Sequence, residues 1–126
     1  MTVVLDTSAF LAVLFTEPGG DSVTARLDEA VMSTVNHCEV VTKLVDAGFD
    51  EARIDAILTS FDVPLHAHDA AQARVAGLLR RATRATGLSL GDRACLALAT
   101  ALDAPVLTAD RAWRNLDAGV AIEVIR

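Results

Sequence analysis

The sequence predicts an α/β protein with three layers, in which helices cover both faces of a central parallel sheet of four or five strands. Short apolar runs, such as residues 3–5, alternate with longer segments of helical periodicity. Such runs are typical of strands buried on both faces, and the helices between them supply the crossovers that parallel strands need. The core should be aliphatic, because 52% of the 126 residues are hydrophobic and only 4% are aromatic. We expect a single domain over residues 1–126.

The first half of the chain predicts strands at residues 3–5 and 31–33. A helix over residues 8–14 ends at a turn formed by Pro18, Gly19 and Gly20. The next helix is expected over residues 21–30. Two more follow over residues 34–47 and 50–61, and Gly48 closes the first of these in the usual C-terminal position.

The second half continues the alternation of strands and helices. Residues 63–65 predict a brief strand, and Pro64 favours an edge position because proline cannot donate to a ladder. Helices are expected over residues 69–85 and 89–102. A strand at residues 104–107, a short helix from Asp110 and a last strand at residues 120–124 complete the chain.

The charge balance argues against a protein that binds nucleic acid chiefly by neutralising phosphates, but it does not exclude a phosphate substrate. The formal net charge is −6, whereas such domains usually carry a strong basic excess. The basic residues are ten arginines and one lysine, Lys43. Two groups of arginines occur in the second half of the chain, and each is either a solvated helix face or a track for phosphates. These groups are Arg74, Arg80, Arg81 and Arg84, and then Arg93, Arg111 and Arg114.

No segment predicts a membrane span or a signal peptide. The longest apolar stretches, residues 9–15 and 94–99, are far shorter than the roughly 18 residues that a span needs, and Asp6 interrupts the start of the chain. Cys38 and Cys95 lie within helical apolar patterns, so we expect both to be buried free thiols. These features favour a cytoplasmic protein.

Two aspartates stand where predicted strands end. Asp6 follows the apolar run Val3-Val4-Leu5, and Asp110 follows Val106-Leu107-Thr108-Ala109. Ligands of an open parallel sheet bind beyond the carboxyl ends of its strands, so both carboxylates should face one crevice. A divalent cation would offset their repulsion, which at about 4 Å is roughly 4 kcal/mol at an effective dielectric of 20. The alternative role for each is a helix N-cap.

Asp92 and Glu39 extend this acidic set. Ser89 and Asp92 have the spacing of a capping box, but the helix face of Asp92 continues through apolar residues such as Cys95, so its carboxylate must be capped, paired or metal-bound. Glu39 lies early on the helix that leaves the second strand, within reach of Asp6. An exposed pair with Lys43 is the alternative for Glu39.

Other candidate chemistries are weaker. His66 and His68 share one face of a strand but lack a third ligand at zinc-like spacing, and His37 is isolated. Ser8 and Ser89 lack the Gly-x-Ser-x-Gly context of a serine nucleophile, so we interpret both as caps.

Taken together, these segments resemble the PIN-domain ribonucleases, and within them the VapC-type toxins of bacterial toxin–antitoxin pairs. The matching segments are Val-Leu-Asp6-Thr-Ser-Ala, Glu39, Gly-Asp92-Arg-Ala-Cys-Leu-Ala-Leu-Ala and Val-Leu-Thr108-Ala-Asp110-Arg-Ala-Trp. The resemblance implies that the four acids form a catalytic metal site. It also implies supporting roles for Thr7, Thr108 and Ser33.

The resemblance further implies an endoribonuclease toxin that hydrolyses structured RNA such as tRNA loops. All-carboxylate ligation favours Mg²⁺ or Mn²⁺ over zinc. A cognate antitoxin and a homodimer are the partners expected from the family.

Two other functions compete with this one. A phosphotransfer domain of the receiver or haloacid-dehalogenase kind also places acids at strand ends, but it needs a lysine near the late strands, and Lys43 lies on an early helix. The non-enzymatic alternative is a catalytically weak binding module whose acidic crevice receives a basic partner peptide.

Overall fold

The computed structural model describes residues 1–126 and contains one five-stranded sheet. All four strand pairings are parallel, and the spatial order is β3-β2-β1-β4-β5. The strands are β1 (Val3–Leu5), β2 (Ala30–Ser33), β3 (Leu65–His66), β4 (Val106–Thr108) and β5 (Ile122–Val124). The predicted fold class is therefore confirmed, and β1 is the central strand, with β3 at an edge as Pro64 indicated.

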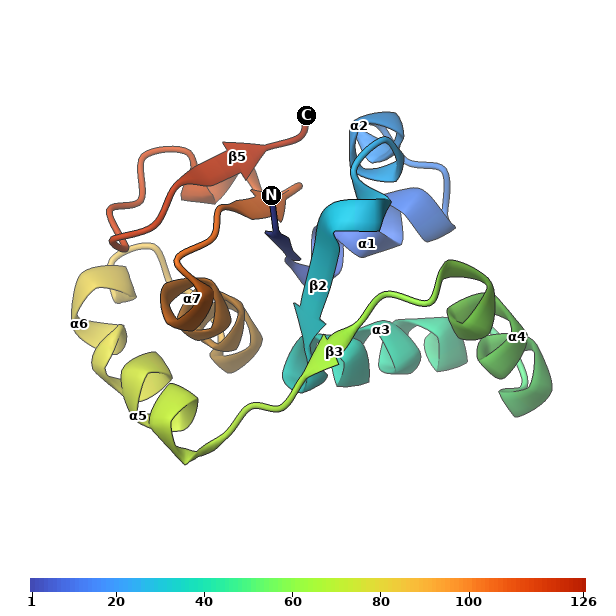
Figure 1. Cartoon of the computed structure of the whole chain (residues 1–126), viewed down its shortest axis with the longest axis horizontal. Helices are drawn as coiled ribbons and strands as arrows, with labels where there is room; N and C mark the ends of the chain where they lie inside the picture. The colour runs from blue at the N-terminus through green and yellow to red at the C-terminus, as the bar shows by residue number, and fades with distance from the viewer.

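Helices cover both faces of this sheet, with α1 to α4 on one side and α5 to α7 on the other (Figure 1). The α-helices are α1 (Thr7–Leu14), α2 (Gly20–Thr24), α3 (Thr34–Asp46), α4 (Glu51–Phe61), α5 (Ala70–Leu78), α6 (Arg80–Thr83) and α7 (Leu90–Leu102). Two 3₁₀ turns, η1 (Leu27–Glu29) and η2 (Arg111–Trp113), complete the chain. None of the helices is long and apolar enough to cross a membrane.

The core is divided by the sheet because successive side chains of a strand point to opposite faces. Val3 and Leu5 of β1 pack on the α1–α4 side with Phe10 and Leu44. Val4 packs on the other side, in a cluster with residues of α7 and with Trp113, which is fully buried. Because both faces of β1 are buried, its residues are all apolar instead of alternating between apolar and polar.

Two predicted helices are wrong in length. The helix expected over residues 21–30 ends at Thr24, because Ala30 pairs with Val3 as the start of β2 and the chain must straighten before it. The helix expected over residues 69–85 divides at Leu79 into α5 and α6. Gly77 lies just before this division and lowers the helix propensity of the last turn of α5.

The two cysteines differ. Cys95 is a buried free thiol, as predicted, but Cys38 is exposed, so its predicted burial is wrong. Cys38 lies one position away from His37 on α3, and the core-facing side of that helix is instead formed by Asn36, Val40 and Leu44. The periodicity of the apolar residues alone did not distinguish these neighbouring positions.

The close approach of α1 and α2 gives a first prediction about stability. A Cβ atom on Gly20 would overlap the backbone carbonyl of Ala12, whereas a Cβ atom on Gly77 would meet no heavy atom within 4 Å. Gly20→Ala should therefore destabilise the protein by about 1–3 kcal/mol. Gly77→Ala should stabilise it by about 0.5–1 kcal/mol, because alanine favours the helix.

Denaturant unfolding of the two variants beside the parent protein measures both effects. Equal stability of the Gly20→Ala variant and the parent would show that α1 and α2 are not in contact at this point.

Candidate active site

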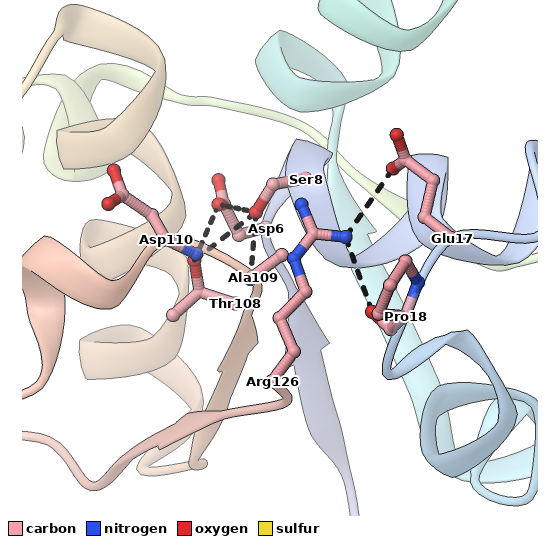
Figure 2. Close-up of polar contacts among 8 residues, drawn as sticks. All are labelled: Asp6, Ser8, Glu17, Pro18, Thr108, Ala109, Asp110 and Arg126. Atoms are coloured by element: carbon pink, nitrogen blue, oxygen red, sulfur yellow. Dashed lines mark hydrogen bonds and ion pairs between the residues drawn. The ribbon is translucent and has the colours of Figure 1, made fainter.

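The Asp6 carboxylate is held at the end of β1 by two hydroxyl groups. Oδ2 of Asp6 accepts hydrogen bonds from Ser8 Oγ at 2.7 Å and from Thr108 Oγ1 at 2.9 Å. Each hydroxyl in turn accepts a backbone N–H, from Ala109 at 2.9 Å and from Asp110 at 3.1 Å respectively. Since an ionised carboxylate can only accept, both hydroxyl protons point towards Asp6. Figure 2 shows this network at the ends of β1 and β4.

Asp6 is buried, with 4% of its surface exposed. Burial raises the pKa of its carboxyl to about 6, and the charge of Asp92 adds to this effect, although the hydrogen bonds from Ser8 and Thr108 lower the pKa. Asp6 occupies the N-cap position of α1 but its side chain makes no capping hydrogen bond. The capping role considered for Asp6 is therefore wrong, because no N–H group of the first turn of α1 binds its carboxylate.

Glu39 is held by a second network on α3. Its Oε1 accepts hydrogen bonds from Thr7 Oγ1 at 2.6 Å and from Asn36 Nδ2 at 2.9 Å. Thr7 thereby connects Glu39 to the chain segment that carries Asp6. The predicted alternative, an ion pair between Glu39 and Lys43, is absent from the four salt bridges of the structure.

Gly91 allows Glu39 to approach α7. A Cβ atom at this position would overlap both carboxylate oxygens of Glu39. Asn36 spans the same gap, since its Nδ2 donates to the Gly91 carbonyl oxygen at 3.0 Å. The residue after Gly91 is Asp92, so this close approach of α3 and α7 brings two of the four predicted acids to the same region.

Asp92 forms the capping box that its spacing with Ser89 predicts. Its Oδ2 accepts the Ser89 N–H at 2.9 Å, while Ser89 Oγ accepts the Asp92 N–H at 3.2 Å. Partial burial raises the pKa of Asp92, and the nearby charges of Glu39 and Asp110 contribute to this rise. Arg93 does not compensate that charge, because its Nη1 donates to the Ala76 carbonyl oxygen.

Asp110 and Ser33 also act as helix caps. Oδ1 of Asp110 accepts the Ala112 N–H at 2.9 Å at the start of η2, and the Asp110 side chain is exposed at the edge of the site. Ser33 Oγ accepts the Val35 N–H at 3.2 Å at the start of α3. Ser33 therefore fixes the helix that carries Glu39, but it makes no hydrogen bond to any of the four acids.

Each of the four acids commits a single carboxylate oxygen to hydrogen bonds with the protein. The committed atoms are Asp6 Oδ2, Glu39 Oε1, Asp92 Oδ2 and Asp110 Oδ1. None of the four acids is in a salt bridge. Arg126, drawn beside the site in Figure 2, donates to the Pro18 carbonyl oxygen at 3.2 Å and lies 3.8 Å from Glu17 instead.

As the side chains lie, no three His, Cys, Asp or Glu residues form a group that could hold a metal ion. Local hydrogen bonds account for this spacing, because each acid is turned towards its own cap or hydroxyl partner. Four like charges without a cation between them also favour separation. The donor chemistry nevertheless fits a hard cation: four uncommitted carboxylate oxygens and no basic side chain paired with them.

Ser8 and Asn36 contact the acids although their positions in the sequence did not predict it. Ser8 was expected to be a cap, but its hydroxyl bridges Asp6 and the Ala109 amide. Asn36 precedes Glu39 by three positions and so shares its helix face, which was the available signal. The alternative considered for that face was an exposed pair of Glu39 with Lys43, whereas Asn36 is fully buried.

Comparisons with known proteins give one family and several similar structures. The model of the PIN domain family matches residues 3–119. No curated protein matches the chain. The DNA-bound VapBC of Salmonella typhimurium is 16% identical with a TM-score of 0.78, and the match covers 100% of this chain and 99% of that chain.

Two further structures are similar over nearly their whole lengths. VapBC-5 of Mycobacterium tuberculosis, a toxin–antitoxin system, is 24% identical with a TM-score of 0.62, covering 100% of this chain and 99% of that chain. FitAcB of Neisseria gonorrhoeae is 19% identical with a TM-score of 0.68, covering 96% of each chain. At these identities the likeness establishes the fold, and the family follows from the match over residues 3–119: the chain belongs to the PIN domain family.

Proposed function

We propose that this protein is a Mg²⁺- or Mn²⁺-dependent endoribonuclease and the toxin of a toxin–antitoxin pair. One observation carries the proposal. Asp6, Glu39, Asp92 and Asp110 come from separate elements, and each keeps one carboxylate oxygen free of hydrogen bonds and pairs with no basic side chain. Membership of the PIN family and the similarity to VapBC structures support a nuclease of the toxin class.

Asp6 and Asp92 are the residues that would hold the metal directly, with Glu39 and Asp110 binding it directly or through water. Carboxylate oxygens are hard donors, which favours Mg²⁺ or Mn²⁺. When bound, such an ion lowers the pKa of a water molecule and stabilises negative charge on a phosphate. No side chain of this site needs to act as a covalent nucleophile.

The protein's own residues prepare the site for that chemistry. Ser8 and Thr108 fix one oxygen of Asp6 by donating to it, so the other oxygen keeps one orientation. Thr7 does the same for Glu39. Rigid placement of charged donors lowers the reorganisation that the reaction requires. Cys95 lies beneath the acids, and burial raises the pKa of its thiol well above its usual range, so it stays neutral.

Substrate RNA would approach from the open side of the site, where Asp110 is exposed and Glu39 and Asp92 are half-buried. Positive charge for its backbone is available on α5 and α6 and the segment that follows them. Four arginines there are exposed and form no salt bridge, namely Arg74, Arg80, Arg81 and Arg84. This supports the phosphate-track interpretation over a face neutralised by neighbouring acids.

A cognate antitoxin and a second copy of the chain are the protein partners in this proposal. The similar structures include several toxin–antitoxin complexes, which supports the antitoxin. The homodimer rests on the family resemblance. We place the reaction in the cytoplasm, where its RNA substrate is found.

Substitution of the acids tests the catalytic proposal. Asp6→Asn and Asp92→Asn should each reduce RNA cleavage in Mg²⁺ or Mn²⁺ by at least about a hundredfold, because each removes a charged ligand worth about 3 kcal/mol in the transition state. Asp117→Asn is the matched control, since Asp117 is exposed in the loop before β5 and makes no hydrogen bond with its side chain. Folding is verified by circular dichroism.

Full activity in both folded variants would refute the nuclease site. A folded parent protein that binds a basic peptide but cleaves no RNA with either metal would instead support a binding module.

The buried charge of Asp6 gives a second prediction, on stability without metal. Because the pKa of Asp6 rises from 3.8 to about 6 on folding, the folded state binds the proton more tightly, and stability falls as the pH rises from 3.8 to about 6. Relative to Asp6→Asn, the parent should lose about 3 kcal/mol between about pH 4 and pH 7 in EDTA.

Bound metal should restore that stability, since ions at 100 times their dissociation constant contribute about 2.7 kcal/mol. Unfolding curves across this pH range, with EDTA and with Mn²⁺, measure both effects. A parent protein whose stability follows that of Asp6→Asn at every pH would contradict the burial of an ionised Asp6.

A further inference from the structure

A buried asparagine beside Glu39 forms an incompletely satisfied set of hydrogen bonds. Asn36 has no exposed surface. Its Nδ2 contacts three acceptors: Glu39 Oε1 at 2.9 Å, the Gly91 carbonyl oxygen at 3.0 Å and Thr7 Oγ1 at 3.2 Å. Its Oδ1 is buried and has no partner. All of the hydrogen bonding of this side chain therefore runs through its NH₂ group.

The orientation of the Asn36 amide is fixed by its neighbours. The Gly91 carbonyl and the Glu39 carboxylate can only accept, so a flipped amide would direct Oδ1 at two acceptors. The hydroxyl proton of Thr7 is used by Glu39 at 2.6 Å, which leaves a Thr7 lone pair for Asn36. The two protons of the Asn36 NH₂ group thus serve three acceptors, so one of them is shared, and every hydrogen bond among Asn36, Thr7 and Glu39 runs towards the Glu39 carboxylate or the Thr7 oxygen.

This arrangement costs stability. A buried carbonyl oxygen without a donor is unfavourable, whereas the NH₂ group of the same side chain supplies a donor to the Glu39 carboxylate and to the Gly91 carbonyl oxygen. In return, the Asn36 NH₂ group connects Glu39 on α3 to Gly91 on α7 through hydrogen bonds. Gly91 is the residue before Asp92.

We propose that Asn36 is a positioning residue that sets the Glu39 carboxylate relative to Asp92 for metal binding. The inference rests on the proposed metal-dependent function and deepens it. Asn36 makes no contact with the reacting atoms and acts through Glu39 alone. Loss of such a supporting partner typically weakens metal affinity by 10- to 100-fold, in rough terms.

The test separates this role from ordinary packing. Mn²⁺ binding is measured by the electron paramagnetic resonance signal of free Mn²⁺, and stability is measured in EDTA. We expect Asn36→Leu to weaken Mn²⁺ binding about tenfold in the folded protein, and the stability in EDTA shows that the compared proteins are equally folded. The Mn²⁺ concentration that gives half-maximal RNA cleavage should rise about tenfold in this variant. The cleavage rate at saturating Mn²⁺ should change by less. Asn115→Ala, at an exposed position outside the site, should match the parent in every assay.

A double-variant comparison shows whether Asn36 works through Glu39. Asn36→Leu combined with Glu39→Gln should bind Mn²⁺ no more weakly than Glu39→Gln alone. If Asn36→Leu does not fold, Asn36→Ala replaces it throughout. Parental Mn²⁺ affinity in the folded Asn36 variant, or independent losses in the double variant, would overturn the inference. A parent protein that neither binds Mn²⁺ nor cleaves RNA would refute the proposed function itself, and the inference with it.

Discussion

The structure depends on one constraint, the burial of the Asp6 charge at the end of the central strand. β1 is surrounded by paired strands and by helices on both faces, so its carboxyl end lies deep in the molecule, and burial raises the pKa of Asp6 to about 6. Two hydroxyl groups hold one oxygen of this carboxylate, but no basic side chain pairs with it. A buried charge without a partner of opposite charge lowers the stability of the folded state. A cation bound beside Asp6 would offset this cost.

Asp92 lies near Asp6, since its charge raises the pKa of the Asp6 carboxyl, and Glu39 and Asp110 in turn lie near Asp92. α3 and α7 lie on opposite faces of the sheet and meet beyond its carboxyl edge, where Gly91 lacks the Cβ atom that would exclude Glu39. Asn36 ties the two helices together there. Ser33 and Ser89 fix where these helices begin, so caps that look purely structural also determine where Glu39 and Asp92 stand.

Much of this arrangement could be predicted from local sequence. Apolar runs identified the strands, the Ser89–Asp92 spacing identified a capping box, and the acids at the ends of β1 and β4 indicated a shared edge. The missed contacts join distant segments: Ser8 and Ala109 are 101 positions apart, and Asn36 and Gly91 are 55 apart. The break between α5 and α6 was also missed, because both sides of Leu79 keep a helical apolar pattern. Such features depend on tertiary packing rather than on propensity.

The central claim is that the four carboxylates surround a cation beside Asp6. Diffraction from crystals grown with Mn²⁺, recorded at the manganese absorption edge, tests this most directly. We predict an anomalous peak within direct coordination distance of Asp6 Oδ1 and bounded by Asp92, with Glu39 and Asp110 binding directly or through water. An Asp6 carboxylate with no ion beside it at saturating Mn²⁺, or a peak confined to other acidic groups, would contradict the account.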